Sequence, residues 1–212
     1  MKKLIIASIA LIMGIYSFPA QAQDLAVPED NMSIEASAPE ALTNRFLRRG
    51  TFSFQYSVSL PLGDFSDFIS KPGTRGFNFE LMGVLNDNLT VGGAVGWYAF
   101  YEHYDRHTYV FEDGALTSEI WNYYYSLPLR AIVQYYFMPD AKVQPFVGLN
   151  ISATYNQRET QVGSFSFNQL TWDFALTPEL GVVIPFGELS DWGALAKVRY
   201  NYTFYNHDQW SN

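Results

Sequence analysis

Seven long stretches of this chain alternate between apolar and polar side chains, and this alternation restricts the possible folds more than any other feature. In "TFSFQYSVSL" (residues 51–60), one parity holds Phe, Phe, Tyr, Val and Leu, while the other holds Thr, Ser, Gln, Ser and Ser. A period of two is that of a β-strand with one apolar and one polar face. The sequence therefore predicts an all-β, antiparallel, up-and-down fold. The other alternating stretches are residues 75–84, 89–101, 119–137, 143–155, 170–185 and 193–205.

Charged residues lie near the middle of several polar faces and indicate which face points inward. The predicted strands are about 10 to 19 residues long, whereas soluble strands average about 5 to 6 and a bilayer-crossing strand needs about 9 to 11. A charge facing lipid near the midplane costs roughly 2 to 4 kcal/mol. We therefore expect a transmembrane β-barrel whose polar face lines the lumen. The structural polar network expected there comprises Glu80, Arg130, Asp173, Glu179, Lys197 and Arg199.

Aromatic residues gather near both ends of the predicted strands, as in the two girdles that hold a barrel at its depth in a bilayer. Aromatic residues make up 17% of the chain and charged residues only 16%, against a typical charged share of about 25%. The girdles are expected to contain Trp97, Tyr101, Trp121, Tyr123, Tyr135, Phe137 and Trp172, together with their neighbours Tyr98 and Tyr136.

The connections between the predicted strands alternate between short and long. Outer-membrane barrels join their strands by short periplasmic turns on one side and longer loops on the other. The pattern therefore predicts three long external loops. The short connections are residues 86–88, 138–142 and 186–192, and the long ones are residues 61–74, 102–118 and 156–169.

The N-terminus has the pattern of a cleaved signal peptide. Lys2 and Lys3 precede an apolar core at residues 4–16, and "AQA" at residues 20–22 supplies small side chains for a signal peptidase. The core is shorter than the roughly 20 residues that a membrane helix needs. We expect cleavage of residues 1–22, a flexible periplasmic lead-in at residues 23–49, and a barrel domain at residues 50–212.

Net charge and cysteine content exclude several partners. The formal charge is −8, and it becomes −10 once residues 1–22, with two lysines and no acidic residue, are removed. Nucleic acids and anionic membrane surfaces select basic proteins, so neither is expected as a partner. The chain contains no cysteine and therefore offers no thiol for a lipid anchor or a disulfide.

With these features, the chain resembles the small, eight-stranded type of bacterial outer-membrane β-barrel, the porin-like outer membrane protein β-barrel domain family. Besides the signal peptide, the resemblance rests on "SLPLRAIVQYYF", "KVQPFVGLNISATYN" and "LTPELGVVIPF", and it covers residues 51–205. It implies location in the outer membrane, insertion by the barrel-assembly machinery and contact with the bilayer. It implies no activity, because the fold has inert, adhesive and enzymatic members.

Only seven strands are readable, whereas a closed antiparallel barrel in one bacterial chain needs an even number. Open strand edges in lipid would leave backbone groups unpaired at several kcal/mol each. Three explanations remain open. The sequence is a fragment or frameshifted product that lacks its last strand, residues before Thr51 supply the strand, or a partner closes the barrel.

Two motifs could carry chemistry. "EHYDRHTYVFED" (residues 102–113) groups His103 and His107 with Asp105, Glu112 and Asp113, residue types that bind divalent metals. A solvated outer loop is the favoured interpretation, because the i, i+4 spacing brings the two histidines close enough to share a metal only on a helix, which this stretch shows no sign of forming. "GGAVG" (residues 92–96) lies inside a predicted strand, where small residues leave room for larger lumen neighbours, and it lacks the helix that follows a phosphate-binding loop.

We therefore expect a non-enzymatic integral outer-membrane barrel with a packed polar lumen and a structural or surface-interaction role. No catalytic, cofactor-binding or metal-binding residue is assigned, and the external partner is not identified. The alternatives are a narrow pore for small solutes or ions, a lipid-modifying enzyme and a soluble ligand carrier. The enzyme would need a catalytic histidine, and the candidates are His103, His107 and His207.

Overall fold

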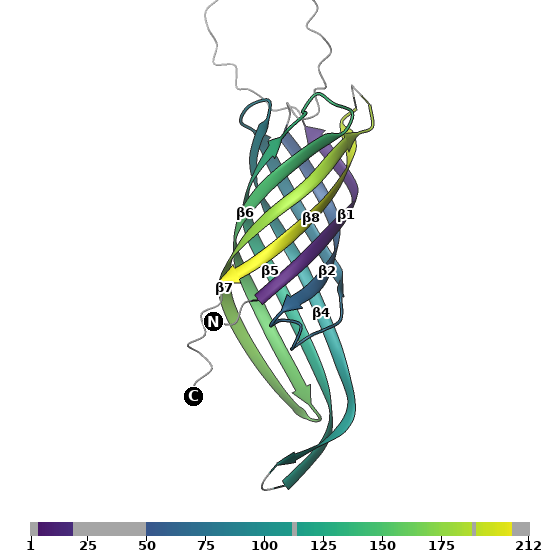
Figure 1. Ribbon diagram of the computed structural model, residues 1–212, viewed down its shortest axis with the longest axis vertical. Helices are drawn as coiled ribbons and strands as arrows, with labels where there is room; N and C mark the ends of the chain where they lie inside the picture. The colour runs from purple at the N-terminus through teal and green to yellow at the C-terminus, as the bar shows by residue number, and fades with distance from the viewer. Residues whose placement is uncertain (1–3, 19–49, 112–113, 188–189, 205–212) are drawn as a thin grey trace, which may run out of the picture.

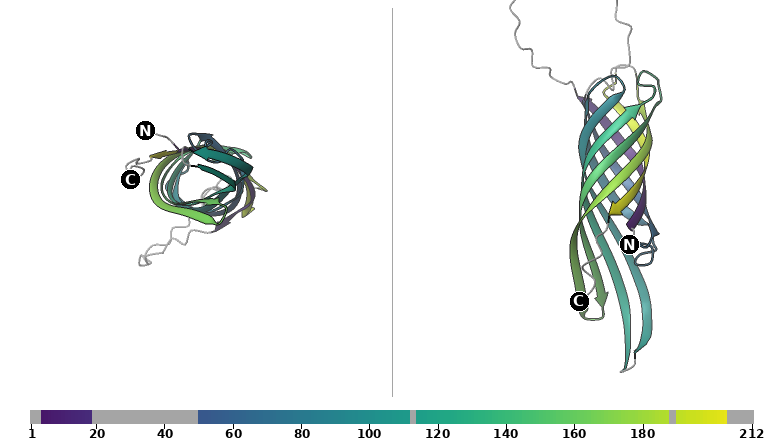
Figure 2. Two further views of the ribbon diagram at one scale, coloured as in Figure 1. Left: turned by 90° about the horizontal axis from the view of Figure 1, so that it is seen from below. Right: turned by 60° about the vertical axis from the view of Figure 1, so that its left-hand side comes forward.

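The computed structural model describes residues 4–18, 50–111, 114–187 and 190–204. Its strands pair antiparallel in chain order, and the first also pairs with the last, so that a closed barrel results (Figure 1). Figure 2 shows the round cross-section of this barrel. Within the described ranges, no helix is long and apolar enough to cross a membrane. The strands are β1 (Leu4–Phe18), β2 (Gly50–Gly63), β3 (Gly73–Val84), β4 (Leu89–Phe111), β5 (Gly114–Tyr136), β6 (Gln144–Val162), β7 (Phe165–Pro185) and β8 (Trp192–Phe204).

The seven strands predicted from the alternation are confirmed as β2 to β8. Their antiparallel, up-and-down order is also confirmed. Burial along them alternates with the period that the sequence predicted, as in β3 and β8. Alternation locates these strands because each presents one face to the barrel interior and the other to the outside.

The strand that closes the barrel is β1, which pairs with β2 on one side and with β8 on the other. It coincides with the apolar core of the predicted signal peptide, so the eighth strand that could not be read from the sequence is N-terminal in this structure. A short, uniformly apolar segment shows no period of two and cannot be recognised as a strand from its pattern. The ladders of β1 contain register shifts between Ile12 and Gly14 and between Leu11 and Ile15.

The two ends of the barrel differ. At the turn end, uppermost in Figure 1, short connections join β3 to β4, β5 to β6 and β7 to β8, close to the predicted turns. At the opposite end, which we call the hairpin end, the β4–β5 and β6–β7 hairpins extend far beyond the other strands.

Two of the three predicted external loops are therefore wrong. Residues 102–118 and 156–169 are mostly strand, because β4 continues to Phe111, β5 begins at Gly114, β6 continues to Val162 and β7 begins at Phe165. Both faces of these hairpin extensions carry polar residues, as in "NQRETQV", so the alternation disappears although the hydrogen-bond ladder continues. The third loop lies between Gly63 and Gly73 and folds back into the barrel mouth.

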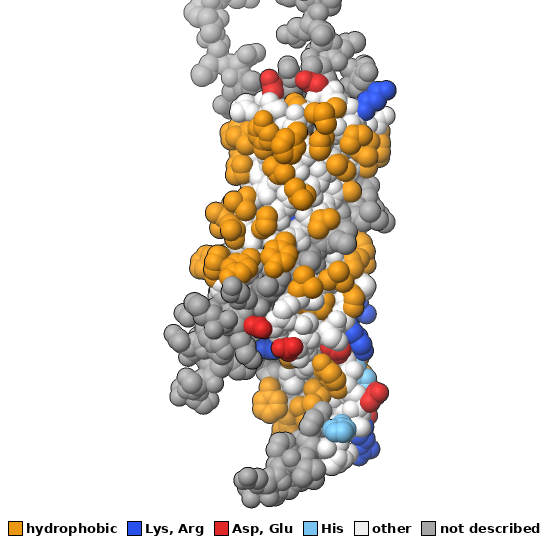
Figure 3. Space-filling view, in the orientation of Figure 1, with side chains coloured by type: hydrophobic (Ala, Val, Ile, Leu, Met, Phe, Trp, Pro, Cys, Tyr) orange, Lys and Arg blue, Asp and Glu red, His pale blue; other side chains and the backbone are white. Residues whose placement is uncertain are grey.

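Apolar side chains cover the outside of the barrel and polar side chains fill its interior. Gln55 on β2 is fully buried, whereas its neighbours Phe54 and Tyr56 are 39% and 41% exposed. Hydrophobic side chains cover much of the barrel wall in Figure 3, and charged side chains appear near its two ends. The predicted girdle residues lie on the outer face, but Tyr98 and Tyr136 lie inside, only 5% exposed. Tyr98 pairs with Ser126 across the β4–β5 ladder, and Tyr136 has the parity of Gln134 on β5; both Ser126 and Gln134 are buried too.

The glycines of "GGAVG" provide space for side chains from the neighbouring strand. A Cβ at Gly92 would meet the backbone oxygen of Leu81 and lie 2.6 Å from Sδ of Met82, whereas at Gly83 the nearest atom would be 3.7 Å away. We expect Gly92→Ala to lower the free energy of unfolding by about 1 to 3 kcal/mol through overpacking. Urea unfolding followed by tryptophan fluorescence measures this, with Gly83→Ala as the matched control. Equal effects of the two substitutions would contradict the close packing at Gly92.

Candidate functional site: the filled interior of the barrel

An apolar cluster fills the interior at the turn end. The rings of Tyr136 and Phe146 pack at an angle of 38° with centroids 5.1 Å apart, and Val183 and Leu195 complete the cluster. All four side chains are at most 5% exposed. The Tyr136 hydroxyl donates to Oε1 of Gln134 at 3.1 Å, which joins the cluster to the polar interior on its hairpin-end side. The turn end of the barrel is therefore closed by side chains.

Next along the axis is a layer of buried ions, which we call the ionic layer. Nζ of Lys197 lies 2.5 Å from Oε2 of Glu80 and 3.2 Å from Oε2 of Glu179. Nε2 of Gln134 donates to both glutamates, at 3.1 and 2.7 Å, and Nε2 of Gln55 donates to Glu80 at 2.9 Å. Buried charges are tolerated when they are paired and their remaining lone pairs accept hydrogen bonds, as here. This layer joins β2, β3, β5, β7 and β8 across the lumen.

Two arginines form the following layer. Arg130 donates through Nη1 to Oδ1 of Asn78 at 2.7 Å and through Nη2 to the Tyr98 hydroxyl at 2.8 Å. Arg199 donates through Nη2 to Oγ of Ser57 at 3.2 Å. Nε of Arg130 and both Nε and Nη1 of Arg199 have no hydrogen-bond partner among the described residues. Because unpaired buried donors are costly, this layer is less well satisfied than the ionic layer.

A small cavity lies beyond the arginines, toward the hairpin end. It has a volume of about 20 Å³, enough for about one water molecule. Beside it, the Asp173 carboxylate accepts from Nδ2 of Asn156 at 2.6 Å and from Oγ1 of Thr171 at 3.1 Å. Oδ1 of Asn156 is buried without a hydrogen-bond partner among the described residues. The lining residues are Tyr98, Tyr124, Ser126, Pro128, Ser152, Thr154, Asn156, Ala175, Asn201 and Thr203.

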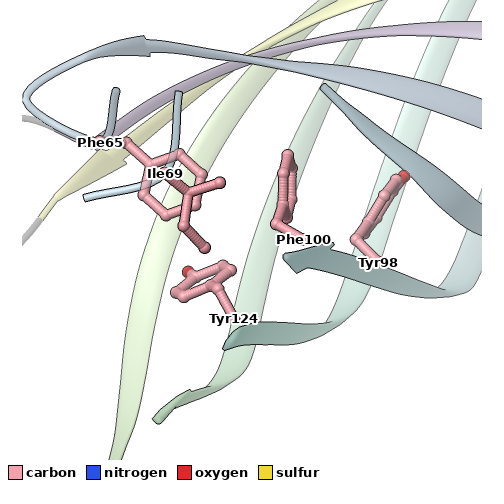
Figure 4. Packing of buried hydrophobic residues seen from close by; sticks show 5 residues of the cluster. All are labelled: Phe65, Ile69, Tyr98, Phe100 and Tyr124. Atoms are coloured by element: carbon pink, nitrogen blue, oxygen red, sulfur yellow. The ribbon is translucent and has the colours of Figure 1, made fainter. Parts of the chain in front are cut away.

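The β2–β3 loop closes the hairpin end, and we call residues 64–72 the plug. Phe65 and Ile69, at most 2% exposed, pack with Phe100 and Tyr124 inside the barrel mouth (Figure 4). The Phe65 ring meets those of Tyr124 and Phe100 edge-on, with centroids 4.7 and 5.2 Å apart. The backbone NH groups of Phe68 and Ile69 both donate to the carbonyl of Phe65, at 3.1 and 3.0 Å, so residues 65–69 form a tight turn. This arrangement fills the barrel mouth at the hairpin end.

Polar contacts hold the plug to the barrel rim. The Glu102 carboxylate accepts from the backbone NH of Ser70 at 2.6 Å and from its hydroxyl at 2.7 Å. Nδ2 of Asn122 donates to the carbonyl of Phe68 at 3.0 Å, and the Arg158 guanidinium lies 3.5 Å from the centre of the Phe68 ring. Residues of β4, β5 and β6 therefore fasten the plug.

The structure places all six charged residues of the predicted lumen network in the interior, each less than 9% exposed. It brings Glu80, Glu179 and Lys197 together, whereas Asp173 bonds to neutral side chains nearer the hairpin end. The sequence reasoning missed the aromatic side chains of the interior, among them Tyr98 and Tyr124. Their parity alone could have identified them.

The histidine motif lies on the β4–β5 hairpin and not in a loop. The His103 ring stacks on Trp121, with centroids 4.0 Å apart, and its nitrogens lie 3.7 Å from Asp105 and 3.6 Å from Glu119. Within the described residues, no group of three or more His, Cys, Asp and Glu side chains could hold a metal. The predicted candidates Glu112, Asp113 and His207 fall on residues whose side chains are outside the described part of the chain.

Comparison with known proteins identifies no relative, because no protein-family model, no curated protein and no solved structure matches the chain significantly.

Proposed function

We propose that this protein is an integral β-barrel of the bacterial outer membrane with a sealed interior and a structural or surface-interaction role. The observation that carries the proposal is the inverted distribution of side chains. Large apolar side chains stand on the outer wall, and charged side chains are buried inside. A soluble barrel buries its apolar face, whereas a barrel in lipid exposes it.

Aromatic side chains at two levels of the wall support placement in a bilayer. Toward the turn end, Tyr135 and Phe137 are 47% and 55% exposed, and toward the hairpin end, Trp97, Tyr101 and Trp172 are exposed as well. Aromatic rings of this kind favour the two membrane–water interfaces. In this placement the turn end faces the periplasm, and the plug and the two long hairpins face the exterior, where they are available to a partner.

A sealed interior is favoured over a narrow pore because side chains fill successive layers along the axis. An apolar cluster, the ionic layer, the arginine layer and the plug follow one another, and the cavity described between the last two is water-sized. Barrels of eight strands enclose just enough space for side chains. We also propose a non-enzymatic role, because the polar groups of the interior are bonded to one another.

The proposal is tested with the native protein. We expect it to stay in the membrane fraction after alkaline carbonate extraction and to leave planar bilayers without channel conductance. A steady single-channel conductance would favour the pore, and release into the periplasmic fraction without detergent would favour the soluble carrier. Mass spectrometry of lipid A after expression tests the lipid-modifying enzyme.

Export through a cleaved signal peptide is part of the proposal. Cleavage conflicts, however, with the role of the same residues as the strand that closes the barrel. Cleavage before Gln23 would remove β1 and leave the facing edges of β2 and β8 without their partner. Unpaired edges are not tolerated in lipid, so another strand would then have to occupy the same place. The intact mass of the protein from outer membranes distinguishes removal of residues 1–22 by a signal peptidase from their retention as part of the barrel.

A further inference from the structure

We propose that the edge of β7 beyond its ladder with β8 is a strand-addition site, which binds an extended, uncharged segment of a partner protein with apolar side chains at alternate positions. The site comprises residues 165–172, which we call the β7 edge. The inference names the surface and the class of partner for the surface-interaction role proposed above, and it rests on that proposal.

The β7 edge has no neighbouring strand in the described part of the chain. The ladder between β7 and β8 ends at the pair of Phe174 and Phe204, whereas β7 continues to Phe165 in its ladder with β6. Figure 1 shows the β6–β7 hairpin extending beyond the end of β8. Such an edge presents unpaired NH and carbonyl groups, to which an extended segment can bind as a further strand. A partner strand would continue the line of the existing β7–β8 ladder.

The backbone groups that point away from β6 belong to every second residue of the β7 edge. Val162 and Phe165 flank a two-residue turn and form a hydrogen-bonded pair. By alternation, four residues direct their NH and carbonyl groups to the open side: Ser166, Asn168, Leu170 and Trp172. Pro178 shares this parity, and the β7–β8 ladder is interrupted beside it, between Leu176 and Glu179, as expected where an NH is missing.

Charge distinguishes the β7 edge from the other strand edge at the hairpin end. Where β4 continues beyond its ladder with β3, it carries Glu102, Asp105 and Arg106, and its ladder with β5 has a register shift between Tyr104 and His107. Charges and bulges protect an edge from strand addition. The β7 edge, with the sequence "FSFNQLTW", carries no charge, and its ladder with β6 is regular. It is therefore suited to a neutral strand.

A row of apolar residues on the inner face of the hairpins ends at the β7 edge. Four residues are paired in succession across β4, β5, β6 and β7 and share one face of the sheet: Tyr104, Ile120, Val162 and Phe165. Phe165 and Phe167 are 72% and 65% exposed. In the proposed bilayer placement both lie beyond Trp172, where they are surrounded by water and not by lipid. Apolar side chains of a fifth strand would extend the row and cover both rings.

These features define the chemistry of the partner strand. It is neutral and extended, with apolar side chains beside the two phenylalanines and small polar side chains beside Ser166 and Asn168. The chain's own residues after Phe204 begin next to the β7 edge, but in the register of the β7–β8 ladder they would place Ser211 beside Phe167. They would not extend the apolar row, so a segment of another protein fits better.

The test is a titration of the folded, full-length barrel in detergent micelles into a fluorescein-labelled peptide of alternating threonine and valine, followed by fluorescence anisotropy. We expect saturable binding. Leu170→Pro removes an NH from the open side and leaves the bonds to β6 in place, so binding is expected to disappear. Leu170→Thr keeps the NH and is the matched control, with binding like that of the natural protein. Phe167→Ser is expected to weaken binding about fivefold through loss of a cross-strand contact.

The gel mobility of unboiled samples verifies that each variant is folded. The proposal is overturned if the folded natural protein shows no saturable binding, if Leu170→Pro binds like Leu170→Thr, or if a peptide of alternating threonine and lysine binds as tightly. Binding that appears only after deletion of residues 205–212 would also overturn it, because the occupant would then be the chain's own C-terminal segment. Dimers of the natural protein that Leu170→Pro abolishes would identify a second copy as the occupant instead. Because the titration uses folded protein in detergent, its failure leaves the membrane placement to be judged by carbonate extraction.

Discussion

Replacement of Lys197 by methionine is expected to be among the most destabilising single substitutions in the barrel. Nζ of Lys197 neutralises Glu80 and Glu179 together, and all three side chains are at most 2% exposed. Without the ammonium group, two carboxylates remain buried next to each other with only neutral donors. Removing one partner of a buried ion pair costs about 3 to 5 kcal/mol. We expect the free energy of unfolding measured in urea to fall by this amount. On gels of samples heated in detergent, the folded band should be replaced by the unfolded band at a lower temperature.

A matched set of variants separates charge from packing. Val198→Ala removes an outward side chain from the next position of β8, where Val198 is 51% exposed, and a small effect is expected. Replacing Glu80 by glutamine together with Lys197→Met removes one carboxylate along with the ammonium group and leaves Glu179 to interact with the nearby Arg199, so it should recover most of the lost stability. If Lys197→Met and Val198→Ala had the same effect, the ionic layer would not contribute as the geometry indicates.

Substitution of Leu129 by arginine is expected to block insertion of the barrel into lipid vesicles. Leu129 lies on the outer face of β5, midway between the two aromatic levels, and is 47% exposed. In the proposed bilayer placement, an arginine there faces the hydrocarbon core at a cost of roughly 2 to 4 kcal/mol. Folding yield into vesicles, read from the mobility of unboiled samples, measures the effect.

The control for this substitution is Leu170→Arg on β7. Leu170 is also outward and 53% exposed, but it lies beyond Trp172, toward the tip of the hairpin. There an arginine stands in water, and normal insertion is expected. A soluble barrel would tolerate arginine at both exposed positions, so equal yields for the two variants would contradict the membrane proposal.

The sequence predicted the barrel wall well because outward-facing and interior-facing positions alternate along β2 to β8. Glu80, Arg130 and Lys197 share the polar parity of their strands, and all are buried. Alternation assigns a residue to a face, however, and not to a partner. That Lys197 meets Glu80, which is 117 residues away, depends on strand order and stagger around the closed barrel.

The plug and the long hairpins could not be read from the pattern for a different reason. Residues 64–72 form no strand, and only the packing of Phe65 and Ile69 on Phe100 and Tyr124 turns them inward. The extensions of β4 to β7 carry polar residues on both faces, so their hydrogen-bond ladders are not visible in the side-chain pattern.

The sequence by itself determined the number and position of β2 to β8 and which side chains face inward, because a two-residue period follows directly from strand geometry. Only the tertiary structure decided which charges pair, how the mouth is closed and which segment closes the barrel. These outcomes depend on contacts between residues far apart in the chain. The apolar segment Leu4–Phe18 shows this best, since its composition suits both a signal peptide and a strand, and its place beside β2 and β8 comes from the two free edges that only the closed barrel brings together.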